Sequence, residues 1–319
     1  MKHIFILNPA AGKGKKLDRF SEKLSAFANE KGLSFELYDT KGKGDATDFV
    51  RGYCTENKDK PVRFYACGGD GTINEVVSGA VGFPYAEVAI LPIGTGNDFV
   101  RMFGEKARFL DLEAQLAAEG RPFDVICRND KYCVNMMNIG FDGEVAARAA
   151  KAKKWFPGKM AYIIGVAGEF FKMSKASFQL WMDGKDMGKR KVLLSLYANG
   201  HFCGGGFHAA PYADLHDGML DVCFIRPVSR LTFLSLVGSY RKGTHLLSEK
   251  AQKYFEYYKC SELVLQFDKP QRVCIDGEIE VYRELKITAL RDAVRIVLPK
   301  GAESTCEALP TSPYIKTTV

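Results

Sequence analysis

The sequence predicts two domains: a Rossmann-like α/β domain comes first, and a mainly antiparallel β domain follows it. The first hundred residues alternate between short apolar runs typical of buried strands and amphipathic helical patterns. From about Asp124 the pattern changes to short strands joined by turn dipeptides such as Asp183-Gly184. A chain of 319 residues is also longer than one compact core usually covers. We therefore expect one domain over residues 1–122 and another over residues 123–299.

The predicted strands and helices of the first domain alternate along the chain. Gly32 supplies a C-terminal stop for the first helix, and Asp45 is a candidate N-cap for the second. This order produces a parallel sheet with helices on its faces, so ligands are expected beyond the carboxyl ends of the strands. The predicted strands are Ile4–Leu7, Ser34–Tyr38, Val62–Ala66 and Val88–Leu91, and the predicted helices are Leu17–Lys31, Asp45–Tyr53 and Thr72–Val81.

The second domain is predicted to consist of short strands with two helical insertions. Helical periodicity runs from about Gly143 to Ser174, with a break at Pro157-Gly158, and again from about Ser229 to Tyr240. The predicted strands are Phe123–Arg128, Tyr132–Ile139, Phe178–Met182, Val192–Ala198, Met219–Ile225, Leu263–Phe267, Arg272–Ile275 and Leu285–Leu290.

Composition limits the function classes. The net charge of +7 suits phosphates, an anionic membrane surface or nucleic acid, but no nucleic-acid-binding signature accompanies it, so no nucleic-acid partner is expected. The nine cysteines are scattered, odd in number and without a C-x-x-C pair, as in a cytosolic protein with reduced thiols. The apolar run Ile4–Leu7 is too short for a signal peptide, and no run of about 18 apolar residues occurs. We expect a cytoplasmic protein whose membrane contact is peripheral.

The loop Gly68-Gly69-Asp70-Gly71-Thr72 is the most informative segment. It joins a predicted strand to a predicted helix, where glycines and free helix N–H groups can approach a phosphate. A carboxylate at Asp70 would repel a bare phosphate but can share a divalent cation with it. The loop therefore indicates metal–nucleotide chemistry, although a capped tight turn is the simpler alternative.

Two further glycine-rich loops follow predicted strands. The first runs from Asn8 to Lys16 and lacks the spacing of a Walker A loop. The second runs from Gly94 to Arg101, with Thr95 between two glycines and Asn97 or Asp98 able to cap the next helix. Each alone is equally compatible with an ordinary turn, but three such loops on one sheet favour a nucleotide site.

Two acidic turns lie in the second domain. Asp276-Gly277-Glu278 reads first as a hairpin turn, and alternatively as a carboxylate placed to accept a proton from a substrate hydroxyl. Asp214 and Asp217 lie three residues apart in a glycine turn, which fits either a simple turn or a Mg²⁺ site.

Two helical segments carry basic and apolar residues together. The helix at 229–240 has an apolar face that is either core or close to a lipid entrance. Its apolar residues are Leu231, Phe233, Leu234, Leu236 and Val237, and the basic residues that flank it are Arg226, Arg230, Arg241 and Lys242. The other segment, residues 148–159, places basic residues next to two aromatic ones. This combination suits contact with an anionic bilayer, although a solvated helix face is the alternative. The residues are Arg148, Lys151, Lys153, Lys154, Trp155, Phe156 and Lys159.

Together these motifs resemble the diacylglycerol kinase catalytic family in its soluble bacterial form, a group that also includes sphingosine and ceramide kinases. The motifs are N-P-x-x-G at Asn8, G-G-D-G-T at Gly68, G-T-G-N-D-F-x-R at Gly94 and D-G-E at Asp276. The second motif alone would fit NAD kinases equally, so the ordered set carries the resemblance. It covers nearly the whole chain and implies an α/β nucleotide domain and a β-sandwich domain, with the tail 300–319 packing back on the first.

The resemblance implies ATP and Mg²⁺ as cofactors. Asp70 would meet the catalytic Mg²⁺, Glu278 would accept the hydroxyl proton, and Asp276 would lie beside it. Residues of the ATP site would be Asn8, Pro9, Ala10, Ala11, Gly12, Thr40, Gly68, Gly69, Asp70, Gly71, Thr72, Asn74 and Thr95.

The resemblance also implies a second, structural Mg²⁺. Asp214, Asp217 and the carbonyl of Met219 would hold this ion, and Asp124 would join its network through water. One position departs from the family pattern: Ala11 stands where many members have Ser. The change removes one hydroxyl contact to phosphate, so at most weaker nucleotide binding is expected.

The function implied is phosphoryl transfer from ATP to the hydroxyl of diacylglycerol, giving phosphatidic acid. A kinase of a sphingoid base or ceramide is the alternative within this family, and a non-catalytic lipid- or nucleotide-binding protein is the alternative outside enzymes. The lipid would be reached at the inner face of the membrane, in a site between the domains. A homodimer is suggested by analogy with the family alone.

Overall fold

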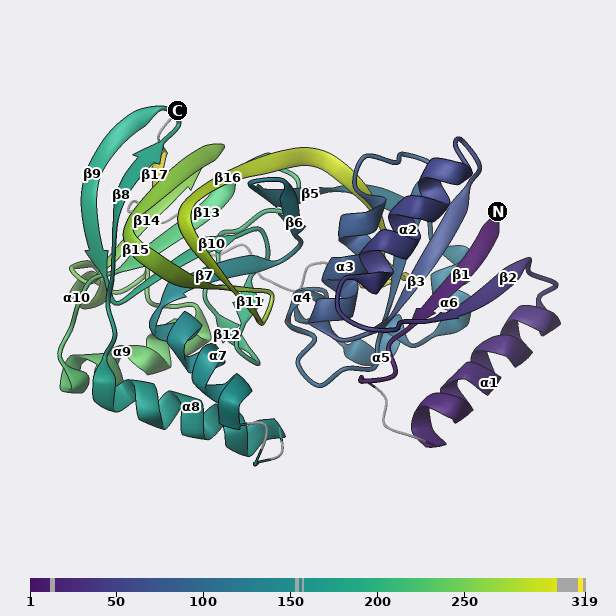
Figure 1. Cartoon of the computed structure of the whole chain (residues 1–319), viewed down its shortest axis with the longest axis horizontal. Helices are drawn as coiled ribbons and strands as arrows, with labels where there is room; N and C mark the ends of the chain where they lie inside the picture. Colours follow the sequence, from purple (N-terminus) through teal and green to yellow (C-terminus); the bar gives the residue numbers. More distant parts are fainter. Residues whose placement is uncertain (12–14, 153–154, 157, 303–314, 318–319) are drawn as a thin grey trace. The chain divides into compact units, whose positions relative to one another are not determined.

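A computed structural model describes residues 1–11, 15–152, 155–156, 158–302 and 315–317, which form two compact units (Figure 1). Unit 1 holds the described residues up to Val125 together with 291–302, and unit 2 holds residues 126–290 together with 315–317. The chain thus returns to unit 1 near Arg291, whereas the sequence pattern assigns residues up to 299 to the second domain.

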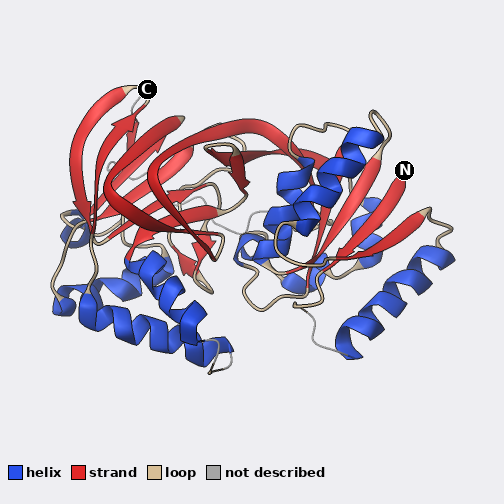
Figure 2. Cartoon of the chain, viewed as in Figure 1, coloured by secondary structure: helices blue, strands red, loops and turns tan. Residues whose placement is uncertain are grey.

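Unit 1 contains a parallel sheet in the order β2–β1–β3–β4–β16 (Figures 1 and 2). Leu7 pairs with Cys67, and Gly68 pairs with Pro92, so β1, β3 and β4 end at one edge. The parallel sheet predicted from the sequence is thereby confirmed. Its strands are β1 (Lys2–Leu7), β2 (Phe35–Asp39), β3 (Val62–Gly68), β4 (Ala86–Pro92) and the last residues of β16 (Glu278–Val297).

Helices cover both faces of this sheet, which explains its continuous apolar strands. Phe5 and Leu7 pack with Leu24 of α1 on one face. On the other, Tyr53 of α2 meets Phe64 of β3 edge to face, with ring centroids 5.7 Å apart. The helices of unit 1 are α1 (Lys15–Glu30), α2 (Asp45–Glu56), α3 (Asp70–Ala80), α4 (Asp98–Arg101), α5 (Lys106–Phe109) and α6 (Leu112–Ala117).

The predicted N-cap of α2 is wrong by one residue. Gly44 occupies that position in the left-handed conformation, and Asp45 is the first helical residue. The Asp45 carboxylate instead accepts hydrogen bonds from the Lys41 N–H and the Tyr38 hydroxyl, both at 2.9 Å.

Unit 2 consists of antiparallel sheets and a layer of helices. Alternate residues of β10 face two cores: Tyr197 packs between the sheets with Phe178 and Val222, while Leu196 packs toward the helices with Val145. The elements are β5 (Gly120–Arg128), which enters from unit 1, β6 (Lys131–Cys133), β7 (Met136–Gly140), α7 (Phe141–Ala152), α8 (Gly158–Lys172), β8 (Ala176–Met182), β9 (Lys185–Val192), β10 (Leu194–Ala198), β11 (Phe202–Cys203), β12 (Phe207–His208), β13 (Leu220–Ile225), α9 (Arg230–Lys242), α10 (Glu249–Gln252), β14 (Phe255–Cys260), β15 (Glu262–Ile275) and β17 (Ile315–Thr317).

The long strand β15 joins two parts of the large sheet of unit 2. Its first half pairs with β8, and its second half pairs with β7. Its register with β16 shifts between Gln266 and Gln271, and such an irregularity bends a strand. The sequence pattern predicts two short strands here because the residues of the shift are polar.

The end of the chain departs from expectation. Residues 315–317 form β17, which pairs in parallel with β14 of unit 2, where Tyr257 lies opposite Ile315. This part of the tail therefore does not pack on the first domain, because the open edge of β14 supplies backbone hydrogen bonds to it. Residues 303–314 lie outside the described chain.

Two features of the described residues bear on the environment of the protein. No helix among them is long and apolar enough to cross a membrane. The cysteines they contain, from Cys54 to Cys274, are free thiols, and most are buried. Cys306 lies outside the described residues.

A buried ion pair ties the sheet of unit 1 to its last helix. Arg63 of β3 donates to the Glu87 carboxylate at 2.7 and 3.0 Å, and its remaining N–H groups reach the carbonyls of Gln115 and Ala118 at 2.7 and 2.8 Å. Both side chains are almost inaccessible to solvent.

We predict that Arg63→Met lowers the free energy of unfolding of unit 1 by about 3–5 kcal/mol, because it removes both hydrogen bonds that the guanidinium gives to the buried Glu87 carboxylate. That carboxylate then keeps the Gly120 N–H at 3.1 Å and the more distant Arg295 guanidinium at 3.9 Å. Urea denaturation followed by circular dichroism measures the loss. Lys31→Met is the matched control, since it removes an ion pair to Glu113 at the surface of the same unit and should leave the midpoint unchanged. Equal midpoints for both variants would contradict the prediction.

Candidate functional site

Three segments that are far apart in sequence meet at the carboxyl edge of the unit 1 sheet. Asn8, which follows β1, donates from its side-chain amide to the Thr72 hydroxyl at 2.8 Å. The Gly94 N–H, after β4, donates to the carbonyl of Gly68 at 3.0 Å. The structure thus brings together the three glycine-rich loops that the sequence singles out.

Glycine is required where two of these loops touch. A Cβ atom on Gly94 would fall far inside van der Waals contact of the Gly69 backbone, and one on Gly68 would overlap the Thr72 side chain. By contrast, a Cβ on Gly71 would meet open space. Gly68 and Gly94 therefore permit close approach of backbone, while Gly71 leaves room beside the loop.

Asp70 links the loops after β3 and β4. It is the first residue of α3, and its Oδ1 accepts a hydrogen bond from the Phe99 N–H at 3.3 Å. Its Oδ2 lies 2.7 Å from where a Cβ on Gly96 would be, so the carboxylate faces the glycine loop. A single carboxylate beside glycine-rich loops is compatible with Mg²⁺, which proteins usually hold through one or two carboxylates together with substrate phosphates.

The beginnings of α2 and α3 differ in how a side chain caps them. The Glu75 carboxylate accepts hydrogen bonds from the Gly44 and Ala46 N–H groups, at 2.9 and 3.3 Å, and so occupies the start of α2. At the start of α3 the N-cap is Gly69, which has no side chain to cap the first turn. A phosphate is therefore expected at α3.

Asn97 holds the third loop in shape and does not cap a helix through its side chain. It occupies the N-cap position of α4 in the left-handed conformation, with φ at 53°. Its side-chain amide donates to the Gly94 carbonyl at 2.8 Å, and no hydrogen bond to its Oδ1 is found among the described residues. The predicted capping bond is replaced by one that closes the loop on itself.

The remaining residues predicted to line the ATP site lie on or next to this edge. The Thr40 N–H donates to the Leu7 carbonyl at 2.8 Å, which places Thr40 beside the end of β1. Thr95 is exposed, and Asn74 is half-buried one turn beyond Asp70. Residues 9–11 follow Asn8, whose side chain accepts a hydrogen bond from the Ala10 N–H at 2.9 Å. Gly12 lies outside the described residues.

The Asp276-Gly277-Glu278 segment of unit 2 is a tight hairpin turn. Asp276 and Gly277 have φ of 45° and 89°, as a two-residue type I′ turn requires, and Ile275 pairs with Glu278 across it. Glu278 is half-buried at the first position of β16. The motif is thus a hairpin turn, and this geometry is compatible with the alternative interpretation, in which Glu278 accepts a proton from a substrate hydroxyl.

Asp276 acts as an anchor for the backbone. Its carboxylate accepts hydrogen bonds from the N–H groups of Val134, Asn135 and Met136 at 2.9–3.3 Å, and the Cys133 thiol lies 3.2 Å away. Burial raises the pKa of Asp276, although these donors oppose the rise. With its oxygens engaged in this way, Asp276 fixes the position of its neighbour Glu278.

An ion pair that the sequence analysis did not predict holds β16 two residues beyond Glu278. Arg128 of β5 binds Glu280 through two hydrogen bonds of 3.0 Å, and the Tyr282 hydroxyl donates to the same carboxylate at 2.6 Å. Burial by itself would raise the pKa of Glu280, but the Tyr282 bond and Arg128 lower it to about 2. Only the approach of β5 to β16 reveals this pair, since the two residues are 152 positions apart.

The groups predicted to hold a second Mg²⁺ do not fit one as they are placed. Asp217 accepts the Lys259 ammonium at 2.7 Å, and the same ammonium lies 3.2 Å from the fully buried Asp221. Burial would lower the pKa of Lys259, but Asp221 and Asp217 outweigh it and raise the pKa. The lysine therefore remains protonated and supplies the positive charge that the metal was expected to provide.

The two other carboxylates expected near that ion each accept a backbone hydrogen bond at one oxygen. Asp214 accepts it from the His216 N–H at 3.0 Å, and Asp124, which belongs to unit 1, accepts it from the Asp292 N–H at 2.9 Å. Among the described residues, no group of three or more Asp, Glu, His or Cys side chains is arranged to hold a metal. We derive no step through a second metal ion.

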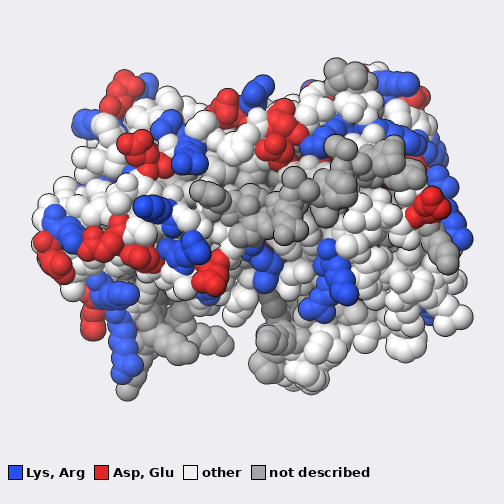
Figure 3. Space-filling view, turned by 180° about the vertical axis from the view of Figure 1, so that it is seen from behind, with Lys and Arg blue, Asp and Glu red and all other residues white. Residues whose placement is uncertain are grey.

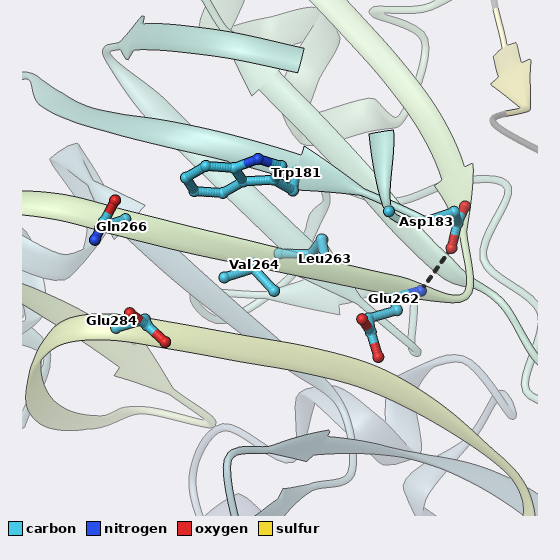
Figure 4. A pocket seen from close by; sticks show the side chains of 8 residues that line it. Trp181, Asp183, Glu262, Leu263, Val264, Gln266 and Glu284 are labelled. Atoms are coloured by element: carbon cyan, nitrogen blue, oxygen red, sulfur yellow. Dashed lines mark hydrogen bonds between the residues drawn. The ribbon is translucent and has the colours of Figure 1, made fainter. Parts of the chain in front are cut away.

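A hollow of about 360 Å³ on unit 2 is lined by Trp181 and by three acidic residues, Asp183, Glu262 and Glu284 (Figure 4). Two of these acids already have partners: Asp183 accepts hydrogen bonds from the Ser261 hydroxyl and the Glu262 N–H, and Glu262 pairs with Lys286 at 2.7 Å. None of the glycine-rich loops contributes to this hollow.

Two family models match consecutive parts of this chain. Residues 2–127 match the diacylglycerol kinase catalytic domain, and residues 135–298 match the YegS C-terminal NAD kinase beta sandwich-like domain. The chain belongs to the diacylglycerol kinase-like family of lipid kinases. The second match alone spans more than half of the chain. The family resemblance carried by the four sequence motifs is thereby confirmed.

Related proteins and structures agree with this family. A protein of Alcanivorax borkumensis named "Probable lipid kinase YegS-like" is 28% identical over 261 residues, which cover 81% of this chain and 85% of the relative. A crystal structure of a diacylglycerol kinase from Bacillus anthracis has a TM-score of 0.66 at 20% identity and covers 95% of this chain and 98% of its own.

The fold extends to a more distant kinase. An NAD kinase from Archaeoglobus fulgidus, solved in complex with ATP, has a TM-score of 0.51 at 12% identity, with 95% of each chain covered. At such identities the structures establish the fold alone. They confirm the predicted α/β domain followed by a β-sandwich domain.

The glycine contact between the loops yields a prediction about stability. Gly94→Ala should lower the free energy of unfolding by about 1–3 kcal/mol, because the new methyl group forces the Gly69 backbone away. Gly71→Ala should leave it unchanged or raise it by about 0.4–1 kcal/mol, since the added Cβ meets no atom and the unfolded chain becomes less flexible. Urea titrations of both variants measure the difference, and a destabilised Gly71→Ala with an unaffected Gly94→Ala would refute the loop geometry.

Proposed function

We propose that this lipid kinase is ATP- and Mg²⁺-dependent and phosphorylates the hydroxyl of diacylglycerol, giving phosphatidic acid. The observation that carries the proposal is the position of Asp70, which bridges two glycine loops at the beginning of α3. An acidic side chain there is unfavourable for a bare phosphate and favourable for a phosphate that carries a divalent cation. The D-G-E turn supplies the second element of the proposal, a carboxylate for the acceptor hydroxyl.

The donor side of the reaction is assigned to unit 1. The N–H groups at the start of α3 and in the glycine loops would bind the phosphates of ATP, and Asp70 would hold Mg²⁺ against them. Mg²⁺, when bound, neutralises charge on the transferring phosphoryl group. Enzymes of phosphoryl transfer work mainly by such positioning and charge stabilisation, so the chain needs no covalent intermediate.

The acceptor side is assigned to unit 2. Glu278 would accept the proton of the lipid hydroxyl while Asp276, through its three backbone N–H partners, keeps the turn in place. Carboxylates are much weaker bases than alkoxides, so the proton should leave late, as the new O–P bond forms. Asp276 is thus a positioning residue, a narrower role than the catalytic one that the family pattern suggests.

We predict that Glu278→Gln lowers kcat by about 10²–10⁴-fold while the KM for ATP stays near the parent value, since the amide keeps the shape but cannot accept a proton. The assay follows label from γ-³²P ATP into lipid in mixed micelles. Glu284→Gln is the matched control, because Glu284 is an exposed acid on the same strand. A kcat near that of the parent would remove Glu278 from the mechanism.

The same assay decides the acceptor. Diacylglycerol, a sphingoid base and ceramide are offered separately under identical conditions. We expect label in diacylglycerol. Label confined to a sphingoid base or ceramide would replace the proposed acceptor within the lipid kinase family, and label in none of the three would contradict the proposed function.

Asp70→Asn is predicted to reduce kcat by at least about 10²-fold and to raise the Mg²⁺ concentration for half-maximal rate. Asparagine retains an oxygen for the Phe99 N–H, so the loop should keep its shape. Binding of Mn²⁺ in the presence of a non-hydrolysable ATP analogue, measured by electron paramagnetic resonance, should weaken in parallel. Asp48→Asn, on the exposed side of α2, is the control. An unchanged Mg²⁺ dependence would exclude Asp70 as the metal ligand.

A further inference from the structure

Helix α8 packs against its neighbour through small residues. Ala161 is fully buried, and a Cβ on Gly165 would lie 2.7 Å from the Val145 carbonyl oxygen of α7. Gly168 of α8 lies against the Arg148 side chain of α7. This pattern lets α7 and α8 approach closely, but it leaves the large side chains of α8 on the outside.

The outer side of α8 is consequently apolar. Met160, Ile163, Ile164 and Phe171 recur at helical spacing and are between 37% and 71% exposed. A surface helix normally buries such a stripe and exposes polar residues. α8 therefore keeps a large apolar surface in contact with solvent.

Helix α9 and the segment between α7 and α8 extend this surface. Arg230, at the start of α9, donates to the carbonyls of Phe170 and Phe171, so α9 begins beside the end of α8. Phe233 packs inward, while Leu231 is 81% exposed. We call the exposed set the apolar face; it comprises Trp155, Phe156, Met160, Ile163, Ile164, Phe171, Leu231 and Leu234.

The charges around the apolar face are basic. Residues 145–175 include seven lysine and arginine residues and one acid, Glu169. Glu169 is fully buried and paired with Arg148 at 3.0 Å, so it adds no negative charge to the surface. Lys151, Lys172 and Lys175 are exposed. In Figure 3 this region, at the lower right, shows white surface with blue side chains above it.

We infer that the apolar face is the surface through which this protein docks on an anionic bilayer. The inference rests on the proposed function, since an enzyme with a lipid acceptor must reach it in a membrane. A bilayer accepts scattered aromatic and aliphatic side chains without a complementary protein surface, and anionic headgroups attract the surrounding lysines. A second copy of the chain would instead bring two basic rims together, which disfavours self-association through this face.

The test measures sedimentation of the full chain with vesicles of phosphatidylcholine alone or of phosphatidylcholine with phosphatidylglycerol. The triple variant Ile163→Ser, Phe171→Ser, Leu231→Ser should lose at least about tenfold in partitioning onto the anionic vesicles, because it removes apolar surface from the membrane contact. Val281→Ser is the matched control, since Val281 is an exposed apolar residue of unit 2 outside the face. Its partitioning should equal that of the parent.

A charge variant tests the second half of the inference and does not depend on the folding of the triple variant. Lys172→Glu with Lys175→Glu should weaken binding to anionic vesicles and leave the weaker binding to phosphatidylcholine unchanged. Parental binding by both variants would overturn the inference. So would a parent dimer that the triple variant converts to monomer in light scattering, because the face would then be a self-association surface.

A water-soluble, short-chain diacylglycerol separates this inference from the proposed function. The triple variant should phosphorylate it in the absence of vesicles at the parental rate, since none of the three residues belongs to the proposed catalytic machinery. Parental activity together with unaltered vesicle binding would overturn the docking surface alone. Impaired vesicle binding with no phosphorylation of any lipid by the parent would support the surface and overturn the proposed function.

Discussion

The candidate nucleotide site depends on one backbone contact, the approach of the loop after β4 to the loop after β3. The Gly94 N–H binds the Gly68 carbonyl, and the absence of Cβ atoms at these glycines lets the two chains meet. The parallel register, in which Gly68 lies beside Pro92, brings both loops to the same edge. Asp70 can bind the N–H of Phe99 because this contact exists, and the direction of its carboxylate toward the glycine loop follows from it.

In unit 2, buried charge mainly holds backbone in place. Asp276 gathers the N–H groups of residues 134–136, and Arg128 fixes Glu280 two residues beyond Glu278. Lys259 forms ion pairs with Asp217 and Asp221 as an internal cation. These interactions divide the acidic residues of the sequence motifs into those that support the fold and those assigned to chemistry, since a carboxylate with its oxygens engaged by donors is poorly placed to receive a proton.

The arrangement of α7, α8 and α9 shows how packing creates a surface. Close approach of α7 and α8 requires small residues at their contact. Val166 of α8 still joins the core, while Met160, Ile163, Ile164 and Phe171 stay exposed. The same helices that complete one core of unit 2 therefore present aromatic and aliphatic side chains to solvent next to exposed lysines. This combination is the basis of the membrane-docking surface that we propose.

The sequence by itself determined the fold class, the parallel order of the first domain and the glycine loops at strand ends, because hydrophobic periodicity and glycine position are local properties. It also predicted the helices around residues 141–172 and their break near Pro157-Gly158. It could not reveal the Arg128–Glu280 ion pair, the cationic partner of Asp217 or the pairing of β17 with β14, since each joins residues more than forty positions apart through strand register. Nor could it separate the inward Phe233 from the outward Leu231: both belong to one apolar pattern, and only the neighbouring helices decide which side chain is covered.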